Sequence, residues 1–332
     1  MTNPEEQIGQ FFIVGFPGER PSRAFLKFIG DRHIGGVILF HENCRTHEIA
    51  RENIRLLRSR FRATIPFIAV DQEGGRVCRL KGAPAEFRAA AEYGRANERE
   101  HFQEDYMRAA VFMESLGFNL NFAPVCDIFL NPSNLCLEGR CFGSDAERVV
   151  PFVEQAVSIS RQAGLLSCLK HFPGLGAASG DPHHETPTAD YDELVWDQQE
   201  MLPFVAGVKA GADMIMTTHL RVPRIDEQIA TASRRIVSGM IRQRLMFDGP
   251  VITDDLLMSG AASLGTPGER AIAAFVAGHD LLLFGREFEK AAEAFEDFLD
   301  AVQEGEIPRE RLSSSLGRVA GLKFKLDRLM IR

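Results

Sequence analysis

Eight short segments of apolar and β-branched residues recur along the whole chain, and no other feature of the sequence constrains the fold as strongly. Between them lie stretches with apolar residues at helical spacing, such as HEIARENIRLLRSRF after the second segment. Unbroken apolar segments are typical of parallel strands that are covered on both faces. Eight consecutive strand–helix units predict an α/β fold, a single (β/α)8 TIM-like barrel, with an open doubly wound sheet as the alternative. The segments are residues 11–16, 35–40, 66–71, 118–125, 167–172, 213–219, 250–255 and 279–285.

Polar and ionisable residues stand at the C-terminal ends of these segments. A barrel gathers all its strand ends at one rim, whereas an open sheet has a single crevice where the strand order reverses. The spread of these residues over six segments therefore favours the barrel, with a functional site at its rim. They are His41, Glu42, Asp71, Glu73, Asp127, Lys170, His171, His219, Asp254 and Asp255.

Length and composition fit one large globular domain. The chain has 332 residues, of which 45% are apolar and 25% charged, and these values exclude disordered, fibrous and coiled-coil proteins. No linker rich in Pro, Gly or Ser divides the chain. We predict one barrel domain over residues 1–332, with a final helix, residues 308–328, packed outside the closed barrel.

Charge and motifs restrict the partners of the protein. The net charge of −8 argues against nucleic acid or an anionic membrane as the main partner. Neither a phosphate-binding GxxxxGK[ST] loop nor a GxGxxG turn occurs, so no nucleotide cofactor is expected. The six cysteines form no CxxC pair and no zinc-like Cys/His spacing, which predicts free thiols and no metal site. Without a signal-peptide pattern or an apolar run of about eighteen residues, the sequence predicts a cytoplasmic protein, and it identifies no protein partner.

Two adjacent aspartates, Asp254 and Asp255, end the apolar segment in VITDDLLMSG. Neighbouring side chains on a strand point to opposite sides, so only one of the two carboxylates can face the centre of the rim. The alternative for each is a structural role as a helix N-cap, a position that Asp favours.

A glycine-rich segment, residues 170–187 (KHFPGLGAASGDPHHETP), follows the fifth strand, where barrels carry lids. Asp181 and His183 flank a proline near its far end. At this spacing the carboxylate can reach an imidazole nitrogen, so the two residues could form a general acid/base pair.

Lys170 is a rim lysine and could be a Schiff-base nucleophile, which keeps an aldolase as a rival function. Beside His171 and the carboxylates of neighbouring strands, a protonated Lys170 would instead bind hydroxyl groups of a polar ligand. In DQEGGRVCRL, Asp71 and two arginines surround a Gly-Gly turn that lets the backbone approach a ligand. The alternative for Arg76 or Arg79 is a simple ion pair with Glu73.

These motifs closely resemble glycoside hydrolase family 3, and within it the single-domain β-N-acetylglucosaminidases of bacterial peptidoglycan recycling. GVILF, VDxEGGRVxRL, GFNLNFAPVxDI, GRxFGSD, KHFPGxG with DxHxETP, and TDDLxMSGA all occur in the family's order. The resemblance implies a barrel that hydrolyses terminal non-reducing N-acetylglucosamine from small soluble glycosides such as peptidoglycan fragments, without a cofactor and with retention of configuration. It also implies that Asp254 is the nucleophile and that His183, held by Asp181, is the acid/base. The sugar-binding positions match Asp71, Arg79, Arg140, Lys170 and His171.

Five positions depart from the family pattern. Leu175 stands where the family usually reads KHFPGHG, and a leucine cannot donate a side-chain hydrogen bond, which bears on the closed lid and on the aglycone preference. Gln72, Cys141, Pro182 and His184 replace a usual His, Ser, Ser and Lys. Two alternatives stay open: a family 3 β-glycosidase or glycoside phosphorylase of other sugar specificity, and a non-catalytic sugar-binding barrel.

Overall fold

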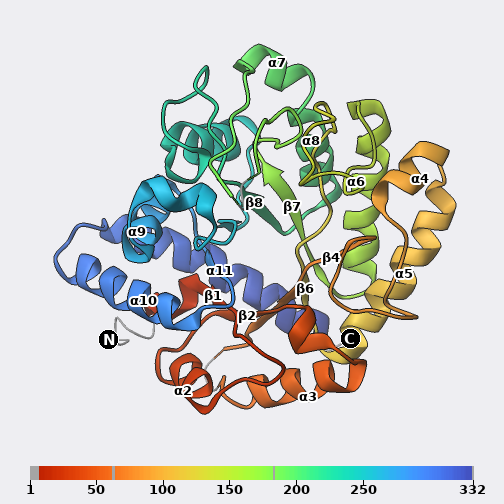
Figure 1. The fold of residues 1–332 in the computed structure, drawn as a ribbon. Coiled ribbons are helices and arrows are strands. Elements are labelled where there is room, and N and C mark those ends of the chain that lie inside the picture. Colours follow the sequence, from red (N-terminus) through yellow and green to blue (C-terminus); the bar gives the residue numbers. More distant parts are fainter. Residues whose placement is uncertain (1–6, 62–63, 182–183, 331–332) are drawn as a thin grey trace.

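The computed structural model describes residues 7–61, 64–181 and 184–330, and its centre is a barrel of eight parallel strands (Figure 1). The strand order is β10, β1, β2, β3, β6, β7, β8, β9. A parallel bridge between Ile252 of β9 and Leu281, the residue before β10, closes the circle. The predicted (β/α)8 barrel is therefore confirmed, and the open doubly wound sheet is wrong. The barrel strands are β1 (Phe12–Val14), β2 (Gly36–Leu39), β3 (Phe67–Val70), β6 (Leu120–Asn121), β7 (Leu166–Phe172), β8 (Met214–Thr217), β9 (Val251–Ile252) and β10 (Leu282–Phe284).

Each strand lies within one of the eight predicted segments or overlaps it by all but one residue. Every residue of these strands is buried, as expected for strands covered on both faces. The register runs in parallel, with Ile13 opposite Leu283 and Val37 opposite Ile68. A short antiparallel hairpin, β4 (Gln72–Gly74) with β5 (Val77–Cys78), follows β3 and was not predicted.

Helices surround the barrel and connect successive strands (Figure 1). Five of the described helices begin at a side chain that accepts a backbone N–H, as at Ser22, Thr46 and Asp145. Between β8 and β9 the connecting helix, η4, is π-helical. The longer helices are α2 (Arg23–Asp31), α3 (His47–Arg58), α5 (Arg99–Leu116), α6 (Ala146–Gln162), α8 (Met201–Ala210), η4 (Arg235–Arg244), α9 (Pro267–Ala277), α10 (Phe288–Gln303) and α11 (Arg309–Met330). Shorter ones are η1 (Gly9–Phe11), η2 (His41–Cys44), α4 (Ala90–Ala96), α7 (Glu193–Gln198), η3 (Ala230–Ala232) and η5 (Ser259–Leu264).

Phenylalanines make much of the contact between helices and barrel. Phe12 of β1 packs edge-on against Phe298 of α10 at 5.7 Å between ring centres, and Phe275 of α9 packs on the same ring at 5.1 Å. Such tilted aromatic pairs stabilise beyond the area they bury. Twenty of the 25 phenylalanines belong to the buried core, four more pack partly buried against it, and Phe324 is exposed. No helix in the described ranges is long and apolar enough to cross a membrane.

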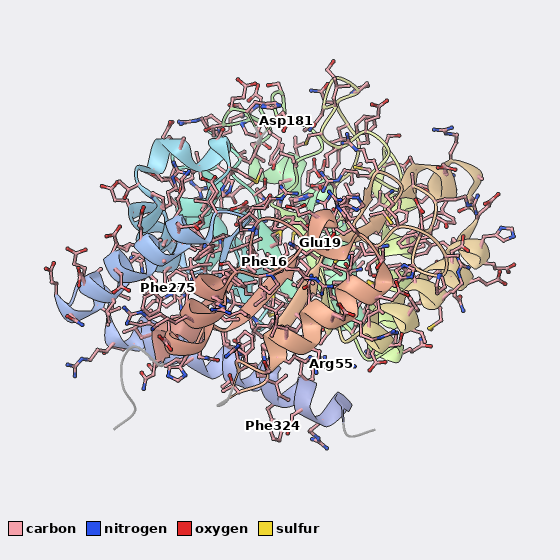
Figure 2. All side chains as sticks on the ribbon, turned by 60° about the horizontal axis from the view of Figure 1, so that its bottom comes forward. Phe16, Glu19, Arg55, Asp181, Phe275 and Phe324 are labelled. Atoms are coloured by element: carbon pink, nitrogen blue, oxygen red, sulfur yellow. The ribbon has the colours of Figure 1, made fainter. Side chains whose placement is uncertain are left out.

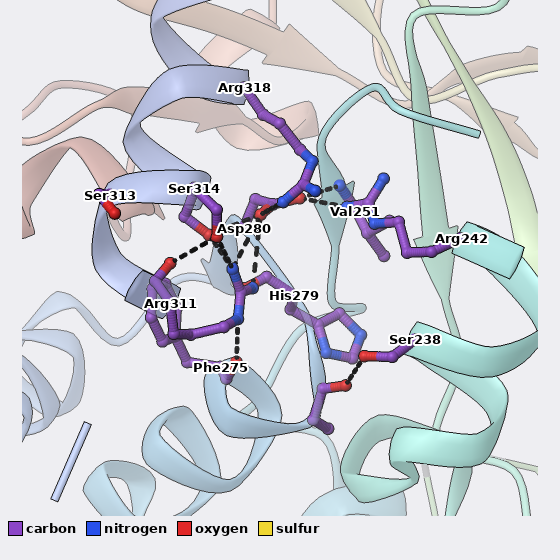
Figure 3. A network of polar contacts seen from close by, with 12 residues as sticks. Ser238, Arg242, Val251, Phe275, His279, Asp280, Arg311, Ser313, Ser314 and Arg318 are labelled. Atoms are coloured by element: carbon purple, nitrogen blue, oxygen red, sulfur yellow. Dashed lines mark hydrogen bonds and ion pairs between the residues drawn. The ribbon is translucent and has the colours of Figure 1, made fainter. Parts of the chain in front are cut away.

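The last helix, α11, crosses the end of the barrel where the strands begin. Lys323 donates to the carbonyl oxygen of Gly35 at 2.9 Å, just before β2, and Lys325 pairs with Asp213, just before β8. Near β10 the buried Asp280 gathers Arg242, Arg311 and Arg318 around one carboxylate (Figure 3). Figure 2 shows Asp181 at one end of the molecule and Phe324 of α11 at the other. Stability and candidate chemistry therefore occupy opposite ends of the same strands.

Candidate active site

A pocket of about 520 Å³ opens at the C-terminal ends of the barrel strands. This is the rim at which barrels carry their active sites. Its apolar walls include Ile38, Met216 and Leu283. The pocket brings together seven of the eight predicted site residues, and the eighth, His183, lies outside the described residues. The seven are Asp71, Arg79, Arg140, Lys170, His171, Asp181 and Asp254.

Lys170 of β7 is the centre of the charged wall of the pocket. Its ammonium lies 2.7 Å from Asp71 Oδ1 and 2.6 Å from Glu73 Oε1, with only 3% of its side chain exposed. Burial lowers the pKa of Lys170, but the charges of the two carboxylates outweigh this and raise it above its ordinary value. A Schiff-base nucleophile needs a neutral amine. The geometry therefore contradicts the aldolase alternative and agrees with a lysine that binds oxygen atoms.

Glu73 is the second carboxylate of this wall and holds Arg140 through a bidentate pair. Arg140 Nε and Nη2 each lie 2.8 Å from a carboxylate oxygen of Glu73. Burial alone would raise the pKa of Glu73, but Arg140 and Lys170 hold it far below its usual range. The alternative of a simple ion pair between Glu73 and Arg76 or Arg79 is wrong, because Glu73 pairs with Arg140 and Arg79 with Asp71. Arg76 instead donates to the backbone carbonyls of residues 135 and 136.

Arg79 approaches Asp71 from the other side, with Nη2 3.7 Å from Oδ2. Its loop is fixed by the buried Gln72, whose Oε1 accepts the backbone N–H groups of Arg79 and Leu80 at 2.9 and 3.0 Å. The amide nitrogen of Gln72 donates to the carbonyls of Leu80 and Ala85. Gln72 departs from the family pattern, yet its side chain bonds four backbone groups of this loop. Arg79 is thus presented to the pocket on a hydrogen-bonded loop.

His171 follows Lys170 and is buried in the same wall. Its Nδ1 lies 2.6 Å from Asp127 Oδ2, and its Nε2 lies 3.2 Å from Arg140 Nη2. A guanidinium donates only, so Nε2 must accept and the ring proton is on Nδ1. Asp127 itself is fully buried behind the pocket. His171 is therefore fixed on both sides before any ligand binds.

The two adjacent aspartates have different surroundings. Both side chains line the pocket, and Asp254 Oδ1 accepts the backbone N–H of Asp255 at 2.8 Å. Asp255 Oδ1 accepts the N–H groups of Leu257 and Gly285 at 3.0 and 2.9 Å, which ties the end of β9 to the end of β10. Burial raises the pKa of Asp255 to about 6. The capping alternative thus describes Asp255, although it caps a turn rather than a helix.

His219, expected at the rim after β8, lies buried beneath this turn. Its Nε2 donates to the backbone oxygen of Asp255 at 2.9 Å, and its Nδ1 accepts from Thr231 at 2.7 Å. Burial lowers the pKa of His219. The imidazole is a neutral support for the strand end that carries Asp254.

The base of the predicted lid is held by backbone hydrogen bonds. Trp196 Nε1 donates to Pro173 O at 2.6 Å, and the hydroxyl of Tyr191 donates to Gly174 O at 3.0 Å. Asn134 donates to the carbonyl of Leu175, whose side chain is buried in the pocket wall. The departure at position 175 therefore makes this wall apolar while its backbone stays fully bonded.

Sequence reasoning missed two residues as members of the site, Glu73 and Asp127, although both were noted at the rim. Residues two apart on a strand share a face, so the spacing of Asp71 and Glu73 was an available signal. Asp127 carried no such signal, because its partners lie 44 and 48 residues away. Nowhere in residues 7–61, 64–181 and 184–330 do three or more His, Cys, Asp or Glu side chains gather as metal ligands would. The six cysteines are free and buried.

Residues 4–322 match the model of the glycosyl hydrolase family 3 N terminal domain. The chain belongs to glycosyl hydrolase family 3. This membership confirms the family resemblance and the enzyme class, a glycoside hydrolase. The family assignment agrees with a pocket that combines carboxylates and cationic side chains at a barrel rim.

Named relatives within family 3 are hexosaminidases. The chain is 34% identical to β-hexosaminidase A of Pseudoalteromonas piscicida over 88% of this chain and 54% of that one. It is 34% identical to the β-hexosaminidase of Vibrio cholerae over 80% of this chain and 79% of that one. A β-N-acetylglucosaminidase structure from Paenibacillus sp. superposes with a TM-score of 0.94 at 32% identity, over 98% of this chain and 63% of that one. A β-N-acetylhexosaminidase from Beutenbergia cavernae gives 0.91 at 28% identity, covering 98% and 99%. The chain thus spans little more than half of the Pseudoalteromonas enzyme.

Proposed function

We propose that this chain is a retaining β-N-acetylhexosaminidase that removes terminal non-reducing N-acetylglucosamine from small soluble glycosides such as peptidoglycan fragments. The observation that carries the proposal is the shared pocket of Asp254, Asp181 and the cationic wall around Lys170. The names of the relatives supply the sugar, and a pocket of about 520 Å³ suits a small ligand rather than a polymer. Action in the cytoplasm stays a prediction.

The chemistry proceeds in two displacements at the anomeric carbon. A carboxylate oxygen of Asp254 forms a bond to that carbon while the bond to the aglycone oxygen breaks, and His183 gives its proton to the departing oxygen. His183 then takes a proton from water, whose oxygen attacks the same carbon and releases Asp254. The carbon is inverted twice, so the configuration is retained. Through both steps Lys170 and the arginines bind sugar oxygens.

Asp181 supports this proposal from the lid. It lines the pocket two residues from His183, at a spacing that lets a carboxylate hold an imidazole and raise its basicity. Most retaining glycosidases use a second carboxylic acid for proton transfer. In the proposed mechanism a His–Asp pair replaces it.

A chromogenic N-acetyl-β-glucosaminide tests the activity, with the corresponding glucoside as the control for sugar specificity. A fluorinated slow substrate followed by peptide mass spectrometry tests the nucleophile, and we expect the adduct on Asp254. An adduct on Asp255 would overturn the assignment. Absence of turnover, with N-acetylglucosamine still bound, would identify a non-catalytic sugar-binding barrel. Product analysis with phosphate present separates a hydrolase from a phosphorylase.

A further inference from the structure

Asp127 lies between the candidate sugar-binding pocket and the start of the lid, shielded from solvent. Its side chain is fully buried behind His171 and does not line the pocket. Oδ2 lies 2.6 Å from His171 Nδ1, and Oδ1 accepts the backbone N–H of Leu175 at 2.7 Å. One carboxylate therefore bonds both His171, a candidate sugar-binding residue on β7, and the first turn of the lid that follows β7.

We propose that Asp127 is a positioning residue that sets the tautomer of His171 and seats the base of the lid through the same carboxylate. The inference rests on the proposed function, because it takes His171 as a sugar-binding side chain and residues 174–187 as the loop that carries the acid/base pair. With its proton on Nδ1, His171 offers Nε2 as an acceptor to Arg140. The opposite tautomer would place two N–H donors against each other and push Arg140 out of the wall.

Only a carboxylate satisfies both partners. Oδ2 accepts from Nδ1–H of His171 at 2.6 Å and from the backbone N–H of His171 at 3.3 Å, and Oδ1 accepts from the N–H of Leu175 at 2.7 Å. An asparagine offers one acceptor and one donor. If its oxygen faces His171, its NH₂ meets the N–H of Leu175 and the lid loses its seat. If its oxygen faces Leu175, its NH₂ takes the lone pair of Nδ1 and forces the proton onto Nε2.

A second buried carboxyl, that of Glu200 at the start of α8, lies close to this site. Burial and the charge of Asp127 raise the pKa of Glu200 well above its ordinary value. It packs under the lid where Gly174 has no side chain, since a Cβ there would lie 2.6 Å from Glu200 Oε2. Of these two carboxyls, it is that of Asp127 that accepts the hydrogen bonds of His171 and Leu175.

The first test reads the tautomer directly. Long-range proton–nitrogen correlation spectra of nitrogen-labelled protein distinguish Nδ1–H from Nε2–H imidazole, and the His171→Asn variant identifies the signal. We expect Nδ1–H in the wild-type protein without substrate. An Nε2–H tautomer would overturn the proposal, and this arm needs neither catalytic activity nor a folded Asp127 variant. A wild-type protein with Nδ1–H and no glycosidase activity would refute the proposed function alone.

The second test is the Asp127→Asn variant. We expect kcat/KM to fall about 10- to 100-fold, the scale of one hydrogen bond to a charged group. If the asparagine oxygen faces Leu175, the tautomer of His171 should change. If the oxygen faces His171, the amide of Leu175 should lose its protection from hydrogen exchange. Retention of both features with kcat/KM within about twofold of the wild type would overturn the proposal.

Asp213→Asn is the matched control. Asp213 is also buried and also accepts a backbone N–H, that of Ser167 at 2.9 Å, while its other oxygen pairs with Lys325. It lies at the opposite end of the barrel. We expect this variant to lose stability and to keep the His171 tautomer, the protection of Leu175 and KM. A merely structural role for Asp127 would make the two variants alike.

Discussion

Replacement of Asp255 by asparagine tests whether the two adjacent aspartates have separate tasks. Burial raises the pKa of Asp255 to about 6, from an ordinary value of 3.8. Its Oδ1 alone accepts both backbone N–H groups, those of Leu257 and Gly285. An asparagine therefore keeps both hydrogen bonds and removes the charge that is costly to bury.

The sign and size of the effect follow from linkage. Because the folded-state pKa lies above the unfolded one, folding takes up a proton between about pH 4 and about pH 6, and the wild-type free energy of unfolding falls as pH rises through that interval. A difference of about two pH units corresponds to about 3 kcal/mol. Since the side chain of Asp255 is partly exposed, we expect about 1–3 kcal/mol. Asp255→Asn should thus be more stable than the wild type above about pH 6 and lose this advantage near pH 4.

Urea unfolding of both proteins from about pH 4 to about pH 8 measures this difference. Asp192→Asn is the control of opposite sign, because Asp192 caps α7 and the N–H of Val195 holds its pKa below the ordinary value. Activity is the second readout: Asp255→Asn should keep hydrolysis, while Asp254→Asn should lose several orders of magnitude. A stability difference that is the same at both ends of the pH range would refute the reasoning, as would an equal loss of activity in the two variants.

Three further outcomes are expected. Asp280→Ala leaves three arginines without their shared carboxylate, which should lower the free energy of unfolding by about 3–5 kcal/mol in urea titrations and leave KM unchanged. His183→Ala should slow substrates with poor leaving groups far more than activated phenols, and equal slowing of both would remove His183 as the acid. Glu73→Gln takes one carboxylate from Lys170 and the bidentate partner from Arg140, so kcat/KM should fall about 10- to 100-fold; an unchanged value would show that the wall does not bind the sugar.

The barrel strands could be predicted from the sequence because a strand that is buried on both faces consists of an unbroken apolar segment, which a short stretch of sequence is enough to reveal. The hairpin of β4 and β5 could not, since strands of two or three residues have no readable period. The predicted segments at β6 and β9 are longer than the regular strands, which span two residues each.

Which residues pair with one another in the site was harder to predict than which residues belong to it. Arg140 pairs with Glu73 across 67 residues of sequence, whereas the nearer arginines 76 and 79 face other groups. The bulge in the β4–β5 hairpin, where Gly74 pairs with Val77, turns Arg76 away from Glu73. The order of the family's motifs identified the pocket residues, but only the fold determines which charged side chains pair with one another.

The two ends of strand β10 show why the stability of the fold and the geometry of the active site can be changed independently. Asp280, before the strand, anchors α11, and the N–H of Gly285, after it, is held by Asp255. Five residue steps of about 3.3 Å separate the two anchors by about 16 Å, beyond the distance at which substitutions usually couple. We therefore expect loss of the arginine cluster to weaken the end of the barrel where the strands begin and to disturb Asp254 much less. At the rim, in contrast, the carboxylate of Asp127 serves both His171 and the amide of Leu175, so we expect the neutral substitution Asp127→Asn to act on sugar binding and on the lid together.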